Sequence, residues 1–389
     1  MKKTSRKDLS LAMFESIITA GLLSMAIMTP FYQSIGLSNS QITLSQSIFT
    51  LVMILLDLPM GWIADRFSRK WANVIGDFGH AVGFLIYATV NSFGGVVMAE
   101  IWLAIFGSLS AGVDISLIRH FSNKIDDTES VFRSKMAQVS FWQNVSTMAL
   151  MALGGPIGAI SFRLAIALSS VPLFLAAIAS IFICDDSEKL VPVEKNPIKD
   201  LIRVIKESNK HPKLRLRIFV QAVGREMTHA TIWFFTPMLL AVGVPIEFVS
   251  LGWVLNYGTA ALGTFLAKKF TWKMKDWVVM AIPVFAVLTG LGMVSVRISI
   301  VTVPFYLLLG LTQGWTSATL KPMTQRFAKN SEQTSVSSLT STVGRIIYAI
   351  AGIIVGIAAD YDLRLAALTN LVIFVPAGII LTIKLFRER

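Results

Sequence analysis

Long apolar stretches separated by short charged segments dominate the chain. A helix that crosses a bilayer needs about 20 mainly apolar residues, and twelve windows of the 389-residue sequence meet that requirement. These windows are 10–32, 42–64, 71–91, 95–118, 134–157, 163–184, 216–240, 247–268, 277–296, 298–320, 335–358 and 364–385. The pattern predicts an all-α membrane protein with twelve transmembrane helices.

Basic residues collect on one side of the predicted spans. The segments after even-numbered spans carry the clusters 66–70, 119–135, 268–275 and 321–329, whereas the opposite segments hold few basic residues. Because Lys and Arg are retained on the cytoplasmic side, both termini are expected to be cytoplasmic. The same bias explains the net charge of +12 without a nucleic-acid partner.

A single long polar connection divides the spans into two sets of six. The expected domains are an N-terminal six-helix bundle at 1–184, a cytoplasmic linker with a short amphipathic helix at 185–213, and a C-terminal six-helix bundle at 214–389. The two halves of the sequence show a weak internal repeat. Thr29-Pro30 and Thr236-Pro237 lie near the ends of spans one and seven, as expected when two related bundles enclose a central site.

A packed charged segment follows the second span. Its members are Gly61, Asp65, Arg66, Arg69 and Lys70. Gly61 is expected to allow two helices to approach closely. Asp65 is expected to meet a cation or the positive N-terminus of a neighbouring helix.

This spacing resembles the loop between the second and third helices of the major facilitator superfamily, Gly-x-x-x-Asp-Arg-x-Gly-Arg-Lys or Arg. Ser68 stands where the family usually has its second glycine. Asp57-x-Pro-x-Gly61 is similar to a bacterial branch of the family. The resemblance implies two pseudo-symmetric six-helix bundles with alternating access, and a conformational-switch role for the loop. It also implies that Asp57 helps to close the cytoplasmic side; a second proton site is the alternative.

Span seven holds the densest set of charged groups inside the predicted membrane region, Arg225, Glu226 and His229. A charge in the hydrocarbon costs several kcal/mol, roughly 2.5–3.5 at a helix centre, so such groups face a cavity or a partner. Glu226 is the leading proton-coupling candidate, with His229 and Asp57 as further candidates. The alternative is a permanent ion pair between Glu226 and Arg225 or Arg345. Either arginine is also a candidate for binding an anionic substrate group.

Polar and aromatic residues in the middle of several spans predict a cavity wall that suits a partly apolar organic molecule. The candidates are Trp142, Gln143, Asn144, Asn256, Tyr257, Gln313, Trp315 and Glu100. Three acids nearer the cytoplasm, Glu15, Asp77 and Asp114, are expected to lean outward to water.

The end of span five, Gly154 to Gly158, resembles a Gly-Pro-x-x-Gly element of family antiporters. Such a sequence bends or thins a helix where it crosses another, and the resemblance favours export by antiport. The arginine that family antiporters usually carry in span four is absent, since Glu100-Ile101-Trp102-Leu103 stands in that region.

The sequence lacks a phosphate-binding loop and the His-Glu-x-x-His and Gly-x-Ser-x-Gly motifs. Its one cysteine, Cys184, excludes an internal disulfide and a thiolate metal cluster. We therefore expect no cofactor and no metal.

The leading hypothesis is a monomeric secondary transporter of a bacterial inner membrane that exports amphipathic organic molecules or drugs against protons. The alternatives are a porter for an anionic metabolite or nutrient and, more remotely, a membrane-embedded lipid-modifying enzyme that uses Glu226 and His229. The expected partners are a small-molecule substrate, protons and the lipid bilayer, and no enzymatic activity is expected.

Overall fold

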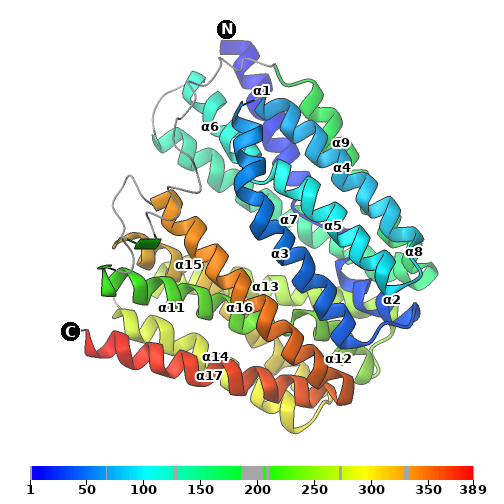
Figure 1. The fold of residues 1–389 in the computed structure, drawn as a ribbon, viewed down its shortest axis with the longest axis vertical. Coiled ribbons are helices and arrows are strands. Elements are labelled where there is room, and N and C mark those ends of the chain that lie inside the picture. The colour runs from blue at the N-terminus through cyan, green and yellow to red at the C-terminus, as the bar shows by residue number, and fades with distance from the viewer. Residues whose placement is uncertain are drawn as a thin grey trace. The chain divides into compact units, whose positions relative to one another are not determined.

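The computed structural model describes residues 2–66, 68–125, 129–184, 205–206, 210–270, 274–327 and 333–388. These residues are mostly helical, and the chain divides into two compact units (Figure 1). Unit 1 comprises Met1–Ile35, Val52–Glu194 and Ile246–Ser250. Unit 2 comprises Gly36–Leu51, Lys195–Pro245 and Leu251–Arg389.

Unit 1 contains most of the first six predicted spans. Its elements are α1 (Lys2–Ile18), η1 (Leu23–Ile27), α2 (Met28–Ser34), the second part of α3 (Asn39–Arg66), α4 (Arg69–Thr89), α5 (Phe93–Ser110), α6 (Val113–Ile125), α7 (Glu129–Ile160), α8 (Phe162–Leu168), α9 (Ser170–Ile181) and η3 (Ile246–Phe248). Within this unit α4 packs against α5 and α9, and α1 packs against α6, α7 and α9.

Unit 2 contains the first part of α3 and the later helices. These are α11 (Pro212–His229), η2 (Ile232–Phe234), α12 (Phe235–Ala241), most of α13 (Val249–Phe270), α14 (Asp276–Val296), η5 (Ile300–Thr302), α15 (Val303–Gln325), α16 (Gln333–Tyr361) and α17 (Leu363–Arg387). The helices α14 and α17 lie side by side, and α11 packs against α15, α16 and α17 (Figure 1).

All twelve predicted windows fall on helical segments. In the described residues, seven segments are long and apolar enough to cross a membrane by length and composition alone. They are Ser5–Ser34, Asn39–Asp57, Phe93–Ile125, Phe162–Ile181, Asp276–Val296, Val336–Tyr361 and Leu363–Arg387. The all-helical fold is therefore confirmed, although several of the remaining helices are more polar than a simple span.

Spans one and seven are both broken, a feature that the hydropathy pattern did not reveal. The first changes from α1 through the 3-10 helix η1 to α2, and the seventh changes from α11 through η2 to α12. Thr29-Pro30 and Thr236-Pro237 lie in the first turns of α2 and α12, where proline is tolerated because the first helical N–H groups lack partners. The repeated Thr-Pro pair thus marks the same type of break in both spans.

The two units differ from the expected domains at two short segments. Gly36–Leu51 groups with unit 2, and Ile246–Ser250 groups with unit 1. The expected linker at 185–213 lies mostly outside the described residues, and of its predicted amphipathic helix only Ile205 and Lys206 are described, both helical. The domain boundaries proposed from the sequence stay a prediction.

Glycines near the end of α7 allow two other segments to approach its backbone. A Cβ atom at Gly154 would lie 2.2 Å from the carbonyl oxygen of Leu23, and one at Gly155 would lie 2.6 Å from that of Glu247. The Gly155 N–H also donates a hydrogen bond to Ser250 Oγ. Any larger residue at these positions would therefore separate α7 from η1 and η3 in unit 1.

Ser68 begins α4 as its N-cap. Its backbone is extended, with φ −172°, and its Oγ accepts a hydrogen bond of 3.3 Å from the N–H of Trp71. A glycine is therefore not required by the backbone at this position. The serine that stands here in place of the family's glycine supplies an oxygen that accepts from one of the otherwise unpaired N–H groups in the first turn of α4.

Replacement of Ser68 by Ala is expected to destabilise α4 by about 1 kcal/mol, because alanine cannot accept this bond, whereas Ser68→Gly should cost only a few tenths. The free energy of unfolding in mixed micelles, measured by SDS titration, would test both variants. An alanine variant as stable as the wild type would contradict the capping role.

Candidate functional site

Unit 2 contains a pocket formed around the break in span seven. Its lining includes His229 from α11, Asn256 from α13 and Gln313 from α15, three of the residues that the sequence predicted for a substrate cavity or proton path. The pocket has a volume of about 20 Å³, which is room for about one water molecule. A substrate can therefore enter only if the lining side chains move.

Three aromatic rings that the sequence analysis did not select complete the pocket wall. Phe235 stacks on Tyr306 with ring centroids 4.6 Å apart, and it meets Trp253 edge-on at 5.3 Å. The hydroxyl of Tyr306 donates to the carbonyl oxygen of Thr231 at 2.7 Å, and Trp253 Nε1 donates to Thr236 Oγ1 at 2.8 Å. Both polar ring atoms are thus satisfied inside the protein, while the ring faces supply apolar surface.

The charged residues of span seven lie next to this pocket. Glu226 is 4% exposed, and its Oε1 lies 3.5 Å from Nε of Arg225, whose side chain is 54% exposed. His229 Nδ1 lies 3.1 Å from the carbonyl oxygen of Arg225, one turn earlier in α11. The structure therefore brings these three predicted residues together, with the carboxylate inside and the guanidinium partly accessible.

The helix α16 covers the buried glutamate. A Cβ atom at Gly344 would lie 3.0 Å from Glu226 Oε1, so the absence of a side chain there leaves room for the carboxylate. Arg345 follows directly in the sequence and is half-buried. Its predicted pairing with Glu226 stays a prediction, and the ion pair that the structure records for Glu226 is the one with Arg225.

The remaining cavity candidates of unit 2 lie outside the lining of the pocket. Trp315 is buried, and its Nε1 donates to the carbonyl oxygen of Val279 at 3.0 Å, so it packs against α14. Tyr257 is half-buried on α13. Trp315 has the environment of a core residue.

In unit 1, Glu100 lies among tyrosines. Its Oε1 accepts hydrogen bonds from the hydroxyl groups of Tyr87 at 2.8 Å and Tyr32 at 3.2 Å, and the two hydroxyls lie 2.6 Å apart. All three side chains are buried. This arrangement satisfies the carboxyl group locally.

Three neighbouring candidates lie in the middle of α7. The rings of Trp142 and Phe141 meet edge-on at 5.4 Å, and Trp142 and Asn144 are exposed. Gln143 is turned toward α1, where its Nε2 donates to the carbonyl oxygen of Ser16 at 3.0 Å and to Ser16 Oγ at 3.1 Å.

The charged segment after the second span occupies the end of α3 and the start of α4. Asp57 is half-buried in α3, while the side chains of Asp65 and Arg66 lie outside the described part of the chain. Arg69 and Lys70 are half-buried, and Lys70 Nζ lies 5.6 Å from the centre of the Trp71 ring. Within the described residues of unit 1, a Cβ atom at Gly61 would meet no heavy atom within 4 Å, so the close helix approach expected there is not seen in this unit.

Asp360, at the end of the Gly356-x-x-Ala359-Asp360 sequence that is similar to Gly61-x-x-Ala64-Asp65, makes the kind of contact with a helix N-terminus that was expected for Asp65. Its Oδ1 and Oδ2 accept from the N–H of Ser40 at 3.1 and 3.3 Å, at the N-terminus of α3. Asn39 Nδ2 donates to the carbonyl oxygen of Ala359 at 3.0 Å. A carboxylate at a helix N-terminus interacts favourably with the helix dipole, and this contact fixes the start of α3 to the end of α16 within unit 2.

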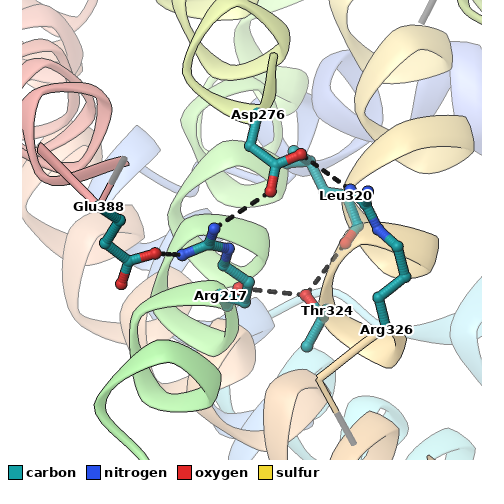
Figure 2. Close-up of polar contacts among 6 residues, drawn as sticks. All are labelled: Arg217, Asp276, Leu320, Thr324, Arg326 and Glu388. Atoms are coloured by element: carbon teal, nitrogen blue, oxygen red, sulfur yellow. Dashed lines mark hydrogen bonds and ion pairs between the residues drawn. The ribbon is translucent and has the colours of Figure 1, made fainter. Parts of the chain in front are cut away.

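An ion-pair cluster missed by the sequence analysis lies where several helices of unit 2 begin or end (Figure 2). Arg217 of α11 is buried, and it pairs with Asp276 of α14 at 3.1 Å and with Glu388 after α17. Arg326 pairs with the other oxygen of Asp276 at 2.8 Å, and Thr324 Oγ1 donates to the carbonyl oxygen of Arg217 at 3.2 Å. One buried guanidinium thus links α11, α14 and α17.

The comparisons with known proteins agree with this architecture. A family model described as Major Facilitator Superfamily matches residues 9–352. The uncharacterized MFS-type transporter YitZ of Bacillus subtilis is 27% identical over 135 residues, which are 33% of this chain and 79% of that protein. The uncharacterized transporter BU466 of Buchnera aphidicola is 23% identical over 255 residues, 64% of this chain and 61% of that protein.

A solved structure gives the same fold over the whole chain. The crystal structure of the nucleoside transporter NupG matches with a TM-score of 0.76, at 12% sequence identity, over 99% of this chain and 98% of that one. At this identity the likeness shows the fold alone.

The helices, their broken spans and the buried charged groups beside a pocket define an integral membrane transporter. The chain belongs to the Major Facilitator Superfamily. It is therefore a secondary transporter that acts on small molecules in the membrane, and the remote alternative of a lipid-modifying enzyme is excluded.

Proposed function

We propose that this protein is a proton-coupled exporter of amphipathic small organic molecules in a bacterial cytoplasmic membrane. The observation that carries the proposal is the pocket of unit 2, where Phe235, Trp253 and Tyr306 stand beside His229, Asn256 and Gln313. Apolar ring faces combined with a few hydrogen-bonding groups suit a partly apolar organic molecule. The close backbone packing of Gly154 and Gly155 is in line with the antiporter-like element of span five.

The coupling step uses the ion pair beside the pocket. Glu226 is buried and lies one turn before the break in span seven. Its ion pair with Arg225 stabilises the ionised carboxylate there. A proton taken up by Glu226 removes this ion pair and frees the partly accessible guanidinium. Because the pair adjoins the pocket residues Thr228 and His229, proton uptake and substrate release are linked through the last turn of α11.

Proton efflux from everted vesicles carrying an imposed proton gradient is the test. A panel of lipophilic cations, organic anions and sugars is added in turn, and one compound is expected to trigger proton efflux. Glu226→Gln should abolish that efflux, because the amide cannot exchange a proton. The matched control is Glu247→Gln, which neutralises an exposed acid in η3 and should leave the efflux unchanged.

A porter for an anionic metabolite or nutrient is the second candidate, favoured by the partial exposure of Arg225 despite its pairing. If no compound moves protons while labelled anions enter intact cells through this protein, the exporter proposal is wrong. Uptake should then be lost in Arg225→Gln, since the neutral amide cannot neutralise an anionic group.

A further inference from the structure

Unit 1 contains a group of buried acids that the transport proposal does not use. Glu15 of α1 and Asp77 of α4 are 2% and 3% exposed, so the expectation that they lean outward to water is wrong. Their side chains share a hydrogen bond, and the charged groups that act on Glu15 are Asp77 and the partly buried Asp114 of α6. The immediate electrostatic neighbours of Glu15 are thus acids.

A hydrogen bond between two carboxyl groups requires a proton. An ionised carboxylate only accepts, so one partner must carry an O–H group to donate. Two carboxyl groups that share a site do not both ionise readily. The Glu15–Asp77 contact therefore has the chemistry of a site that holds one proton and exchanges it as access to water changes.

The surroundings of the pair leave polar atoms unsatisfied. In the described residues, Glu15 Oε2, Asp77 Oδ2 and Asn73 Oδ1 are buried without a hydrogen-bond partner. Asn73 is fully buried, its side chain is hydrogen-bonded to Glu15, and its Nδ2 donates to Ser180 of α9 at 3.3 Å. An unpaired polar atom in a protein interior is costly, and a proton bound by the carboxyl pair lowers this cost because a protonated carboxyl group can donate to a neighbouring acceptor.

The polar contacts continue from this pair to the middle of α7. Ser16 Oγ donates to Asp114 Oδ2 at 2.5 Å, and Gln143 Nε2 donates to the backbone and hydroxyl oxygens of Ser16. Asp77 is also hydrogen-bonded to Ser110 at the end of α5. The groups that act on the pair from α4, α5 and α6 are therefore Asn73, Ser110 and Asp114, while Gln143 of α7 and Ser180 of α9 contact Ser16 and Asn73 beside it.

The break in span one gives Glu15 the same local position as Glu226. Glu15 lies in the last turn of α1, where its carbonyl oxygen accepts from the N–H of Thr19, and Glu226 lies in the last turn of α11, where it accepts from Ala230. Broken helices near the midplane carry the coupling-ion sites of many transporters. A negative charge is disfavoured at a helix C-terminus, but only Glu226 has an arginine beside it to offset this.

We infer that Glu15 and Asp77 form a second proton-binding site, in unit 1, distinct from the ion-paired Glu226 of unit 2. The ligand is a proton, because a hydrogen bond between two carboxyl groups needs one, and no group of three or more His, Cys, Asp or Glu side chains in the described part of the chain is suited to a metal ion. Asp114, Ser16 and Gln143 connect this site to the residues predicted for the cavity wall. The inference does not depend on the transported compound.

Infrared spectroscopy of the purified wild-type protein at neutral pH tests the inference without a substrate. The spectrum is expected to contain a C=O stretching band of a protonated carboxyl group that shifts in D₂O. Glu15→Gln and Asp77→Asn should each remove this band or change its frequency, because each takes away one of the two carboxyl groups that share the proton, so either variant suffices if the other does not fold. Asp360→Asn, which changes an exposed carboxylate, is the control and should leave the band unchanged.

Three results would overturn the inference. These are a band that persists at the same frequency in both unit 1 variants, a band lost only in Glu226→Gln, and a band removed by sodium at constant pH, which would indicate a metal cation. The vesicle assay separates this inference from the proposed function. If no compound triggers proton efflux while the band behaves as expected, the exporter proposal fails and the proton site stands.

Discussion

The double substitution Asp276→Asn with Glu388→Gln is expected to destabilise unit 2 by about 3–5 kcal/mol, the typical cost of a buried charge left without its partner. Arg217 is only 5% exposed, and these two carboxylates are its ion-pair partners (Figure 2). The neutral amides keep the shape of the side chains and remove the charges. The free energy of unfolding by SDS titration in mixed micelles measures the effect.

Arg217→Met should be less harmful than the double substitution. Methionine fills a similar volume without a charge, and the two carboxylates left behind are each about one-fifth exposed and accessible to water. Asp276 also keeps its ion pair with Arg326. A double variant as stable as Arg217→Met would show that the guanidinium reaches water and would contradict its burial.

Asp362→Asn is the matched control for these substitutions. Asp362 caps α17 by accepting from the N–H of Arg364 at 2.7 Å, and its exposed ion pair with that side chain holds the pKa of the Asp362 carboxyl below its ordinary value. Asparagine caps a helix about as well as aspartate, and exposed ion pairs contribute little. No measurable loss of stability is therefore expected.

Gly314→Ala is expected to destabilise the contact between α13 and α15 by about 2 kcal/mol or more, as overpacking of a tight interior does. A Cβ atom at Gly314 would lie 1.7 Å from the carbonyl oxygen of Ala260, and one at Gly263 would lie 2.0 Å from that of Leu311. Both clashes involve backbone atoms, so a rotamer change cannot relieve them. The two helices would have to separate and lose the bond of 3.1 Å from Thr264 Oγ1 to the carbonyl oxygen of Gly314.

The apparent melting temperature of the purified protein in detergent checks this expectation. Gly258→Ala is the matched control, because a Cβ atom at Gly258 on the same helix α13 would meet nothing within 4 Å. This control is expected to match the wild type or exceed it slightly, since alanine favours the helix. Equal melting temperatures for Gly314→Ala and Gly258→Ala would show that α13 and α15 do not pack through these glycines.

Gly263 illustrates how a sequence pattern can be interpreted in two ways. Together with the lysines at 268, 269 and 273 it resembles a worn copy of the charged segment after the second span. In the structure it provides space for the backbone of α15. Glycine spacing alone does not distinguish a switch loop from a helix-packing site, because both require a residue without a side chain.

The sequence by itself determined the class of protein. Runs of about 20 apolar residues are accommodated in a bilayer as helices. The basic residues between them collect on the side that membrane insertion keeps in the cytoplasm. Span seven was also predicted to hold Arg225, Glu226 and His229, and helix periodicity places His229 one turn from Arg225, because residues three or four apart on a helix share a face. These inferences depend on local spacing, which the sequence states directly.

Only the tertiary structure decided which polar groups meet across helices. Glu15 and Asp77 are 62 residues apart, and Arg217 and Glu388 are 171 residues apart, so no local pattern connects them. Hydropathy placed Glu15 near the cytoplasm but did not reveal the break after α1 or the packing that buries this side chain. Whether a charged side chain is exposed, ion-paired or protonated depends on neighbours from other helices, and the fold alone supplies those neighbours.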